Sequence, residues 1–387
     1  MGVINYKCKT CGGQLNYDIE SKKLLCSSCR TSYDISEYEQ KGIKDGNLEV
    51  LVCNNCGAKV VGNDTIFSTT CIYCRSNLIV KKKLEEKYKP NYIIPFRNKK
   101  EDILDILEKY LKSSIFSSKD FFNKDNIVSI NSLYVPYWLY SCDAMYSIKG
   151  TSTTSNNDRT VFESRPFSRS CELKIERVPA DAKVNLDNTF LQGLEPFNYE
   201  DLIEFDYPYL LGSIAEYYDE DKETIIHSQI KERVVEAAYT RLSKTIPSGS
   251  VAIHSRQTYM GKEKFESVLM PIWFVSIEYR DKIYEFCVND QTGKVSGIRY
   301  LNKLKIFLIS FIFVFSWLFV GKLLLTLLGE DAFLNNIMLL IWFLGMSFGC
   351  MGIYRLCNSY THIVSGKKSV DYIKEGTYKQ LFTSDQF

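Results

Sequence analysis

Histidine is scarce in this chain of 387 residues, and the chain has almost no net charge. Its three histidines are His227, His254 and His362, and none lies in an HExxH pair or beside a GxSxG turn. A phosphate-binding glycine loop is also missing. Lys and Arg number 48 against 46 for Asp and Glu, so no overall field attracts nucleic acid. We therefore expect a protein that is not an enzyme.

The amino-terminal sequence lacks the positive segment and apolar stretch that mark a signal peptide. Tyr6 stands where a myristoylation motif needs Ser or Thr. We therefore expect the amino terminus to stay in the cytosol.

Cysteine, in contrast, is abundant and regularly spaced. Eight of the 13 cysteines form four CxxC pairs, and 14 residues separate the two pairs within each half. Every cysteine of the second half lies 45 positions after its counterpart in the first, which indicates an internal duplication. The eight predicted metal ligands are Cys8, Cys11, Cys26, Cys29, Cys53, Cys56, Cys71 and Cys74.

Two pairs of thiolates at this spacing are typical of a tetrahedral zinc site, so the pattern predicts two zinc ions. Gly12 and Gly57 follow the second cysteine of their pairs, where a turn often requires positive φ. A disulfide framework is disfavoured in a reducing compartment. Because four sulfurs close the coordination shell, the zinc is expected to be structural.

The charges near these units do not favour nucleic acid as a partner. The nearest basic cluster is Lys81, Lys82 and Lys83, just past the second unit. We interpret it as a solvated linker, with a phosphate-binding patch as the alternative.

Two long apolar stretches near the carboxyl terminus predict a transmembrane hairpin at 304–356, with spans at about 306–328 and 335–355. Arg299, Lys303 and Lys305 precede the first span, and the connecting loop has no Lys or Arg. The positive-inside rule then places both termini in the cytoplasm, as a multi-pass protein of the cell membrane. Gly345 and Gly349 form a GxxxG pair that allows close approach between the spans or between protomers, which leaves a homo-oligomer open.

The region between, 90–300, alternates helical and strand patterns, which predicts a cytosolic α+β domain. One helical face carries Ile103, Ile106 or Leu107, Tyr110 and Leu111, and a second helix carries Ile226, Ile230, Val234, Ala237 and Leu242. The segments "LYVPYWLY" and "VLMPIWFV" place Pro136 and Pro271 two residues before a tryptophan. This similarity suggests a second duplication, with each proline at a strand edge or bulge.

Three further cysteines in this region, Cys142, Cys171 and Cys287, would be nucleophiles only if a histidine approached them. For Cys142 and Cys287, which lie in strand-like stretches, burial is the simpler interpretation. The hairpin around Asp290 and Gly293 is expected to be structural.

The chain resembles the YdjG-like family of bacterial tandem zinc-ribbon membrane proteins of the TFIIB type. The resemblance rests on the two cysteine units, "IIPF", "LYVPYWLY", "MPIWF" and "NDQTGKVSG". It differs at Arg30 and Arg75, where the family usually has glycine, so we expect a different turn there. The resemblance implies partners of the SPFH, TPM or PspA type and a role in membrane stress or envelope maintenance.

The predicted domains are zinc ribbons at 1–40 and 48–83, the α+β domain at 90–300, the hairpin at 304–356 and a cytosolic tail at 357–387. The expected function is that of a membrane-anchored adaptor that docks partner proteins at the bilayer. A membrane-tethered nucleic-acid-binding or regulatory protein is the first alternative. An enzyme with an unrecognised site in 90–300 is the second.

Overall fold

The computed structural model describes most of the chain outside the predicted second span. The described residues are 7–38, 49–53, 55–62, 73, 80–83, 90–113, 116, 118, 120–155, 162–182, 188–216, 222–225, 229–328, 345–347, 351, 355 and 379–384. The first cysteine unit, called ribbon 1 (7–38), forms a sheet of its own. Its elements are β1 (Leu15–Asp18), β2 (Lys23–Cys26), β3 (Ser32–Tyr33) and the short helix η1 (Ile35–Glu37).

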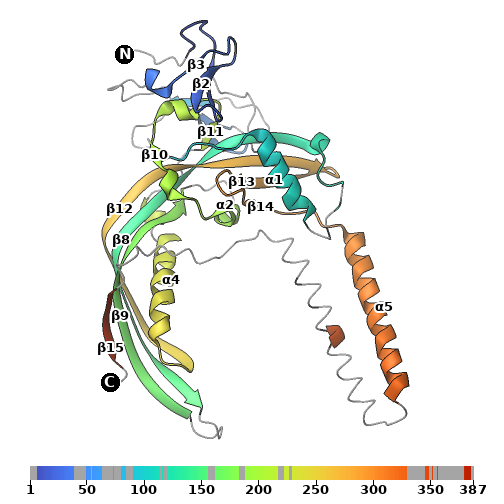
Figure 1. The fold of residues 1–387 in the computed structure, drawn as a ribbon. Coiled ribbons are helices and arrows are strands. Elements are labelled where there is room, and N and C mark those ends of the chain that lie inside the picture. Colours follow the sequence, from blue (N-terminus) through green and yellow to red (C-terminus); the bar gives the residue numbers. More distant parts are fainter. Residues whose placement is uncertain are drawn as a thin grey trace.

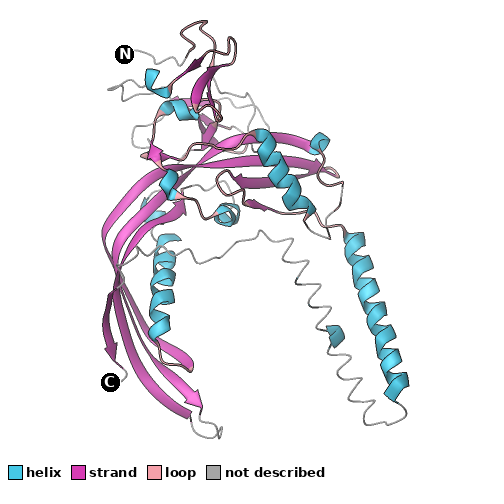
Figure 2. Ribbon diagram, in the orientation of Figure 1, coloured by secondary structure: helices cyan, strands magenta, loops and turns pink. Residues whose placement is uncertain are grey.

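All other described strands belong to one 12-stranded sheet, with helices on its faces (Figures 1 and 2). The strands are β4 (Glu49–Val52), β5 (Lys59–Gly62), β6 (Val80–Lys83), β7 (Tyr92–Ile93), β8 (Ile127–Ser155), β9 (Phe162–Asp181), β10 (Ile203–Glu204), β11 (Ile214–Glu216), β12 (Ser250–Tyr279), β13 (Lys282–Asn289), β14 (Val295–Gly297) and β15 (Lys379–Ser384). The α-helices are α1 (Lys100–Lys112), α2 (Asn188–Leu194), α3 (Lys222–Ile225), α4 (Lys231–Leu242) and α5 (Lys303–Leu328), and the 3-10 helices are η3 (Lys124–Asn126), η4 (Tyr199–Asp201), η5 (Tyr207–Leu210) and η7 (Ser243–Thr245).

The second cysteine unit is part of this sheet, not a separate one. The strand order runs β10-β7-β12-β8-β11-β5-β4-β6, so β5 of the second unit pairs with β11 of the central region. The basic cluster Lys81–Lys83 lies in β6, paired with β4. The prediction of a linker is therefore wrong, because the backbone of this cluster takes part in the ladder.

The sheet is built on the antiparallel pairing of β8 with β12, which extends over almost the whole length of both strands. Val135 pairs with Met270, and each immediately precedes its proline. Around this pair, β8 and β12 each pair with a short parallel strand, at positions that are 135 residues apart in the sequence. The strand β11 pairs in parallel with 133–134 of β8, and β7 pairs in parallel with 268–269 of β12. The repeat expected from the two Pro–x–Trp segments is therefore visible in the strand pairing.

Pro136 and Pro271 are not at sheet edges, contrary to the expectation from sequence. Each lies where the neighbouring strand changes. On one side of β8, the pairing with β11 ends at Tyr134 of β8, and the pairing with β9 begins at Tyr137. On one side of β12, the pairing with β7 ends at Leu269 of β12, and the pairing with β13 begins at Ile272. A residue without an N–H fits here because neither neighbour needs its donor.

Beyond Tyr140 the sheet continues as a curved extension, the arm, formed by 141–155, 162–176 and 250–262 (Figure 1). Buried and exposed residues alternate along its strands: Cys142, Ala144 and Tyr146 are buried. Helix α4 covers this inner face with Ile230, Val234, Ala238 and Leu242. Ala238 takes the buried position expected for Ala237, which is only partly buried.

Four segments on which the family resemblance rests converge at the other end of the sheet. Phe96 of "IIPF" packs on Tyr134 and Trp273, with ring centroids 4.7 and 5.5 Å apart. The Trp273 Nε1–H donates to the buried carboxylate of Asp290 at 2.8 Å. The backbone N–H groups of Arg97 and Asn98 donate to the same carboxylate at 2.5 and 3.2 Å. These segments therefore form a structural cluster beneath α1, where Ile103, Leu107 and Leu111 are buried and Ile106 and Tyr110 are partly buried.

We predict that Asp290→Ala destabilises the folded chain by at least about 2 kcal/mol, because three N–H donors lose their buried acceptor. Chemical unfolding of the detergent-solubilised protein, followed by tryptophan fluorescence, measures the change. Asp105→Ala, which removes an exposed carboxylate from α1, is the control and should have little effect. Equal stabilities of the two variants would contradict the role given to Asp290.

Candidate metal centre

Ribbon 1 holds Cys8 and Cys11 in a tight turn before β1. The Gly12 N–H donates to the Cys8 carbonyl at 2.8 Å, and the Cys8 N–H donates to the Gly13 carbonyl at 2.8 Å. Gly12 has φ of +72°, which favours glycine, as the sequence predicted. The turn directs both sulfurs to the same side.

A second turn of the same kind holds Cys26 and Cys29. Arg30 N–H donates to the Cys26 carbonyl, and the Cys26 N–H donates to the Thr31 carbonyl, both at 3.0 Å. Arg30 takes the position of Gly12 and has φ of +62°. The expectation that arginine changes this turn is wrong: the turn is kept, and Arg30 adopts the left-handed conformation.

The four sulfurs of ribbon 1 lie within 4.8 Å of one another. Cys8 Sγ is 3.5 Å from Cys29 Sγ, and Cys11 Sγ is 3.6 Å from Cys26 Sγ. Four thiolates about 2.3 Å from a tetrahedral zinc ion would be separated by about 3.8 Å. The group could therefore hold a metal ion such as zinc.

Each of the four sulfurs also has a hydrogen-bonding group directed at it. Gly13 N–H donates to Cys11 at 3.4 Å, and Cys29 N–H donates to Cys26 at 3.5 Å. Two hydroxyls serve the other pair: Tyr33 lies 3.2 Å from Cys8 Sγ, and Thr31 lies 3.1 Å from Cys29 Sγ. Such contacts spread the negative charge of thiolates and orient them toward a metal.

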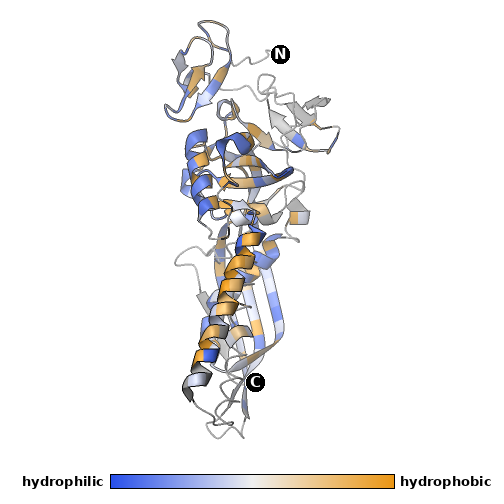
Figure 3. Cartoon of the chain, turned by 90° about the vertical axis from the view of Figure 1, so that its right-hand side faces the viewer, coloured by the Kyte–Doolittle hydropathy of each residue, from blue (hydrophilic) through white to orange (hydrophobic). Residues whose placement is uncertain are grey.

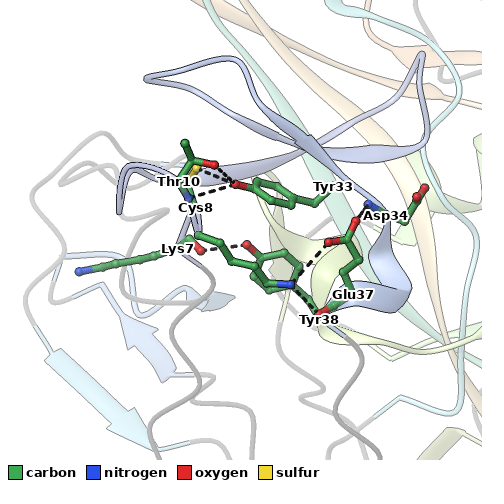
Figure 4. A network of polar contacts seen from close by, with 8 residues as sticks. Lys7, Cys8, Thr10, Tyr33, Asp34, Glu37 and Tyr38 are labelled. Atoms are coloured by element: carbon green, nitrogen blue, oxygen red, sulfur yellow. Dashed lines mark hydrogen bonds and ion pairs between the residues drawn. The ribbon is translucent and has the colours of Figure 1, made fainter.

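The hydroxyl of Tyr33 is the centre of a small polar network (Figure 4). It accepts from the Thr10 N–H at 3.1 Å and lies 2.7 Å from Thr10 Oγ1. Burial raises the pKa of the Cys8 thiol, but the hydrogen bonds from Tyr33 and from the backbone outweigh it and lower the pKa below its usual value. Cys8 is therefore prepared to ligate as a thiolate.

Ribbon 1 is fixed to the central region by β1. Tyr17 N–H donates to the Leu211 carbonyl at 2.9 Å, and the rings of Tyr17 and Tyr209 meet edge to face. Leu211 is buried in the core of ribbon 1. An ion pair between Glu20 and Lys99, at 2.6 Å, adds a contact to α1.

Half of the second predicted site lies among the described residues. Gly57 N–H donates to the Cys53 carbonyl at 2.9 Å, and Cys53 N–H donates to the Ala58 carbonyl at 2.8 Å. Gly57 has φ of +73°, so this turn repeats that of Cys8 and Cys11. The remaining predicted ligands, Cys71 and Cys74, lie outside the described residues, as does Arg75. A second metal site is therefore only weakly indicated by Cys53 and Cys56.

The other candidate residues do not form a reactive group where they are described. Burial raises the pKa of the thiols of Cys142 and Cys171 to about 11, and it raises that of Cys287 further. His254 lies 3.1 Å from the Thr151 hydroxyl, nine residues along β8 from Cys142. His227 and His362 lie outside the described residues.

A second functional feature is the apolar helix α5. Its segment Lys303–Leu323 is long and apolar enough to cross a membrane, and little of it is buried against the rest of the chain. In Figure 3 most of the helix is coloured as hydrophobic residues. The predicted second span lies mostly outside the described residues, but 345–347 are helical. Gly345 lies against the Trp317 ring, where an added Cβ would come within 2.5 Å.

We predict that Tyr33→Phe weakens metal binding by ribbon 1 about 10- to 100-fold, because the Cys8 sulfur loses its hydroxyl contact. Zinc affinity is measured by competition with a colorimetric chelator. Cys53→Ser combined with Cys56→Ser is the common background, so that only ribbon 1 is titrated. Tyr38→Phe removes a hydroxyl that donates to the Lys7 carbonyl and is the matched control. Equal affinities of the two tyrosine variants would exclude this role.

Comparison with known proteins found one protein with a similar sequence. The uncharacterized protein YdjG of Bacillus subtilis (strain 168) is 28% identical over 307 residues, which cover 76% of this chain and 89% of YdjG. No family model matches the chain. No solved structure matches it either. The similarity to YdjG and the four-cysteine cluster fit a zinc-ribbon-like family.

Proposed function

We propose that the chain is a membrane-anchored zinc-ribbon adaptor without enzymatic activity, which docks partner proteins at the bilayer. The observation that carries this proposal is the placement of two features. Ribbon 1 lies at one end of the molecule, and α5 extends from the other end of the central region (Figures 1 and 3). A protein that presents a surface at a fixed position relative to a membrane needs this arrangement.

The ligand set supports a structural metal. Cys8, Cys11, Cys26 and Cys29 would hold one zinc ion, and Cys53 and Cys56 with Cys71 and Cys74 would hold a second. Four sulfurs fill a tetrahedral shell and leave no position for a reacting water. When bound, zinc supplies folding free energy, on the order of 10 to 16 kcal/mol in small units of this kind. The role of the site is thus to shape a docking surface.

We further propose that the chain crosses the membrane twice, with both termini in the cytoplasm. Strand β15, which follows the apolar region, pairs antiparallel with β9 of the arm over Lys379–Ser384. Strands that share a ladder must lie on the same side of a bilayer. If α5 crosses, a returning span between 329 and 378 is required, and 335–355 is long and apolar enough.

The family resemblance favours partners of the SPFH, TPM or PspA type and a role in membrane stress or envelope maintenance. The docking surface we favour is the outer end of ribbon 1, where Cys11, Cys29 and Arg30 are exposed. This end lies away from the contacts of Tyr17 with the central region.

The adaptor proposal predicts that Cys11→Ser combined with Cys29→Ser abolishes recruitment of partners without loss of membrane insertion. Both side chains are exposed and neither belongs to the central sheet, so the change removes two metal ligands without removing a side chain from the core of that sheet. Proteins that co-purify from detergent-solubilised membranes are quantified by mass spectrometry, with Tyr38→Phe as the control. Unchanged recruitment by the double variant would remove ribbon 1 from the docking role.

The topology proposal predicts different activities for two alkaline phosphatase fusions in bacteria. The enzyme should be active when it is inserted in the loop after Asp331 and inactive when it follows Phe387, because it folds only outside the cytoplasm. A fusion after Tyr300, before α5, is the control and should be inactive. Activity after Phe387 would show an odd number of crossings and would contradict the topology.

A further inference from the structure

The chain enters α5 from a corner of the central sheet rich in aromatic rings. Tyr300 stands three residues before the first residue of α5. Its ring stacks on Phe121 at 5.9 Å and meets the edge of Tyr279 at 4.9 Å. Tyr284 adds a further edge contact to Phe121. Four rings from separate segments therefore form a cluster at the point where the chain leads into α5.

An arginine lies between two of these rings. Arg280 and Asp281 form the two-residue turn between β12 and β13, with φ of +52° and +58°. The guanidinium of Arg280 lies 5.4 Å from the centroids of both Tyr279 and Tyr300. It also donates to the Tyr300 hydroxyl at 2.9 Å. These contacts fix an exposed cation beside the entry to α5.

Exposed apolar side chains stand at the same end of the sheet. The β13–β14 ladder begins with Phe286 paired to Gly297. Ile283 and Ile298 lie just beyond that pair and are 51% and 47% exposed. Isolated exposed isoleucines are unremarkable on a soluble surface. Two of them at the end of the sheet from which the chain leads into α5, with an arginine held by tyrosines, form a surface of mixed chemistry.

This mixture of groups matches the headgroup region of a bilayer. Tyrosine concentrates where an apolar ring and a hydroxyl both find partners. Arginine and lysine place their alkyl stems in the apolar layer and their charges among phosphates. Lys282 is exposed beside Arg280, and Lys303 is exposed at the start of α5. Asp281 and Glu285 are also exposed here. Because these carboxylates oppose a strongly anionic surface, we expect Arg280 and Lys282 to contact individual headgroup phosphates.

We infer that this surface, the junction patch (Arg280, Lys282, Ile283, Ile298 and Tyr300), rests on the phospholipid headgroups of the bilayer that α5 enters. The inference rests on the proposed membrane anchoring and adds a second contact to it. Continuity with α5 selects lipid over a protein partner. Because α5 starts three residues after Tyr300, the patch lies close to the plane where the helix meets the headgroups. The patch then sets how the central region sits on the membrane.

The test is photo-crosslinking of the full chain in proteoliposomes of phosphatidylcholine with phosphatidylglycerol. p-Benzoylphenylalanine replaces Ile283 in one variant and Ile298 in a second. Tyr259, which is 70% exposed on the arm, is replaced in the control. After irradiation, mass spectrometry detects adducts between protein and phospholipid. Adducts at 283 and 298, at least about tenfold above those at 259, are expected.

A second comparison uses the charged part of the patch. Arg280→Gln combined with Lys282→Gln, in the Ile283 probe variant, should reduce the lipid adduct several-fold, because the headgroup contacts are lost. Glutamine keeps a comparable length and the same backbone strain at position 280. An unchanged yield would show that these cations do not contact headgroups.

Carbonate extraction separates this inference from the anchoring proposal. Protein that resists extraction but gives no lipid adduct at 283 or 298 would overturn the junction patch and leave the anchor standing. Release of the protein by carbonate would overturn the anchor itself and the patch with it. Adducts to protein instead of lipid would show a partner subunit on this surface and would also overturn the patch.

Discussion

The pairing of β8 with β12 is the constraint on which the rest of the molecule depends. Around Val135 and Met270 the two strands run antiparallel, and each changes its outer neighbour at a proline. On one side of this centre the ladder carries α1 and the Asp290 cluster. On the other it carries α4 and the arm. Because both cores share the same two strands, a shift of register would disturb them together.

The cysteine units are less independent than their size suggests. One segment of the central region, Tyr207–Glu216, contacts both. Leu211 is buried in the core of ribbon 1, and the following strand β11 pairs with β5 of the second unit. Metal bound in ribbon 1 would therefore stabilise a segment that also supports the second unit. Folding of the amino-terminal third and of the sheet are linked by these contacts.

Local patterns predicted local structure well. The apolar spacing in α1, the positive φ of Gly12 and the turn at Gly293 all follow from the side chains nearby. The arm was missed because segments such as "GTSTTS" combine Gly, Ser and Thr, which usually mark loops. The pairing of β5 with β11 could not be predicted, because about 150 residues separate the two strands and no local sequence signal encodes their pairing. The contact of Tyr33 with Cys8 could be found only in three dimensions.

The direction of the arm restricts how a membrane could surround α5. Both leave the central region toward the same side (Figures 1 and 3). The outer face of the arm carries Lys149, Glu172 and Lys174, and each charge would cost several kcal/mol inside hydrocarbon. In a flat bilayer the arm and α5 therefore cannot be immersed together. If α5 crosses a bilayer, the angle between α5 and the arm must therefore keep these charges out of the hydrocarbon, and Asn302, which caps α5, lies where that angle is set.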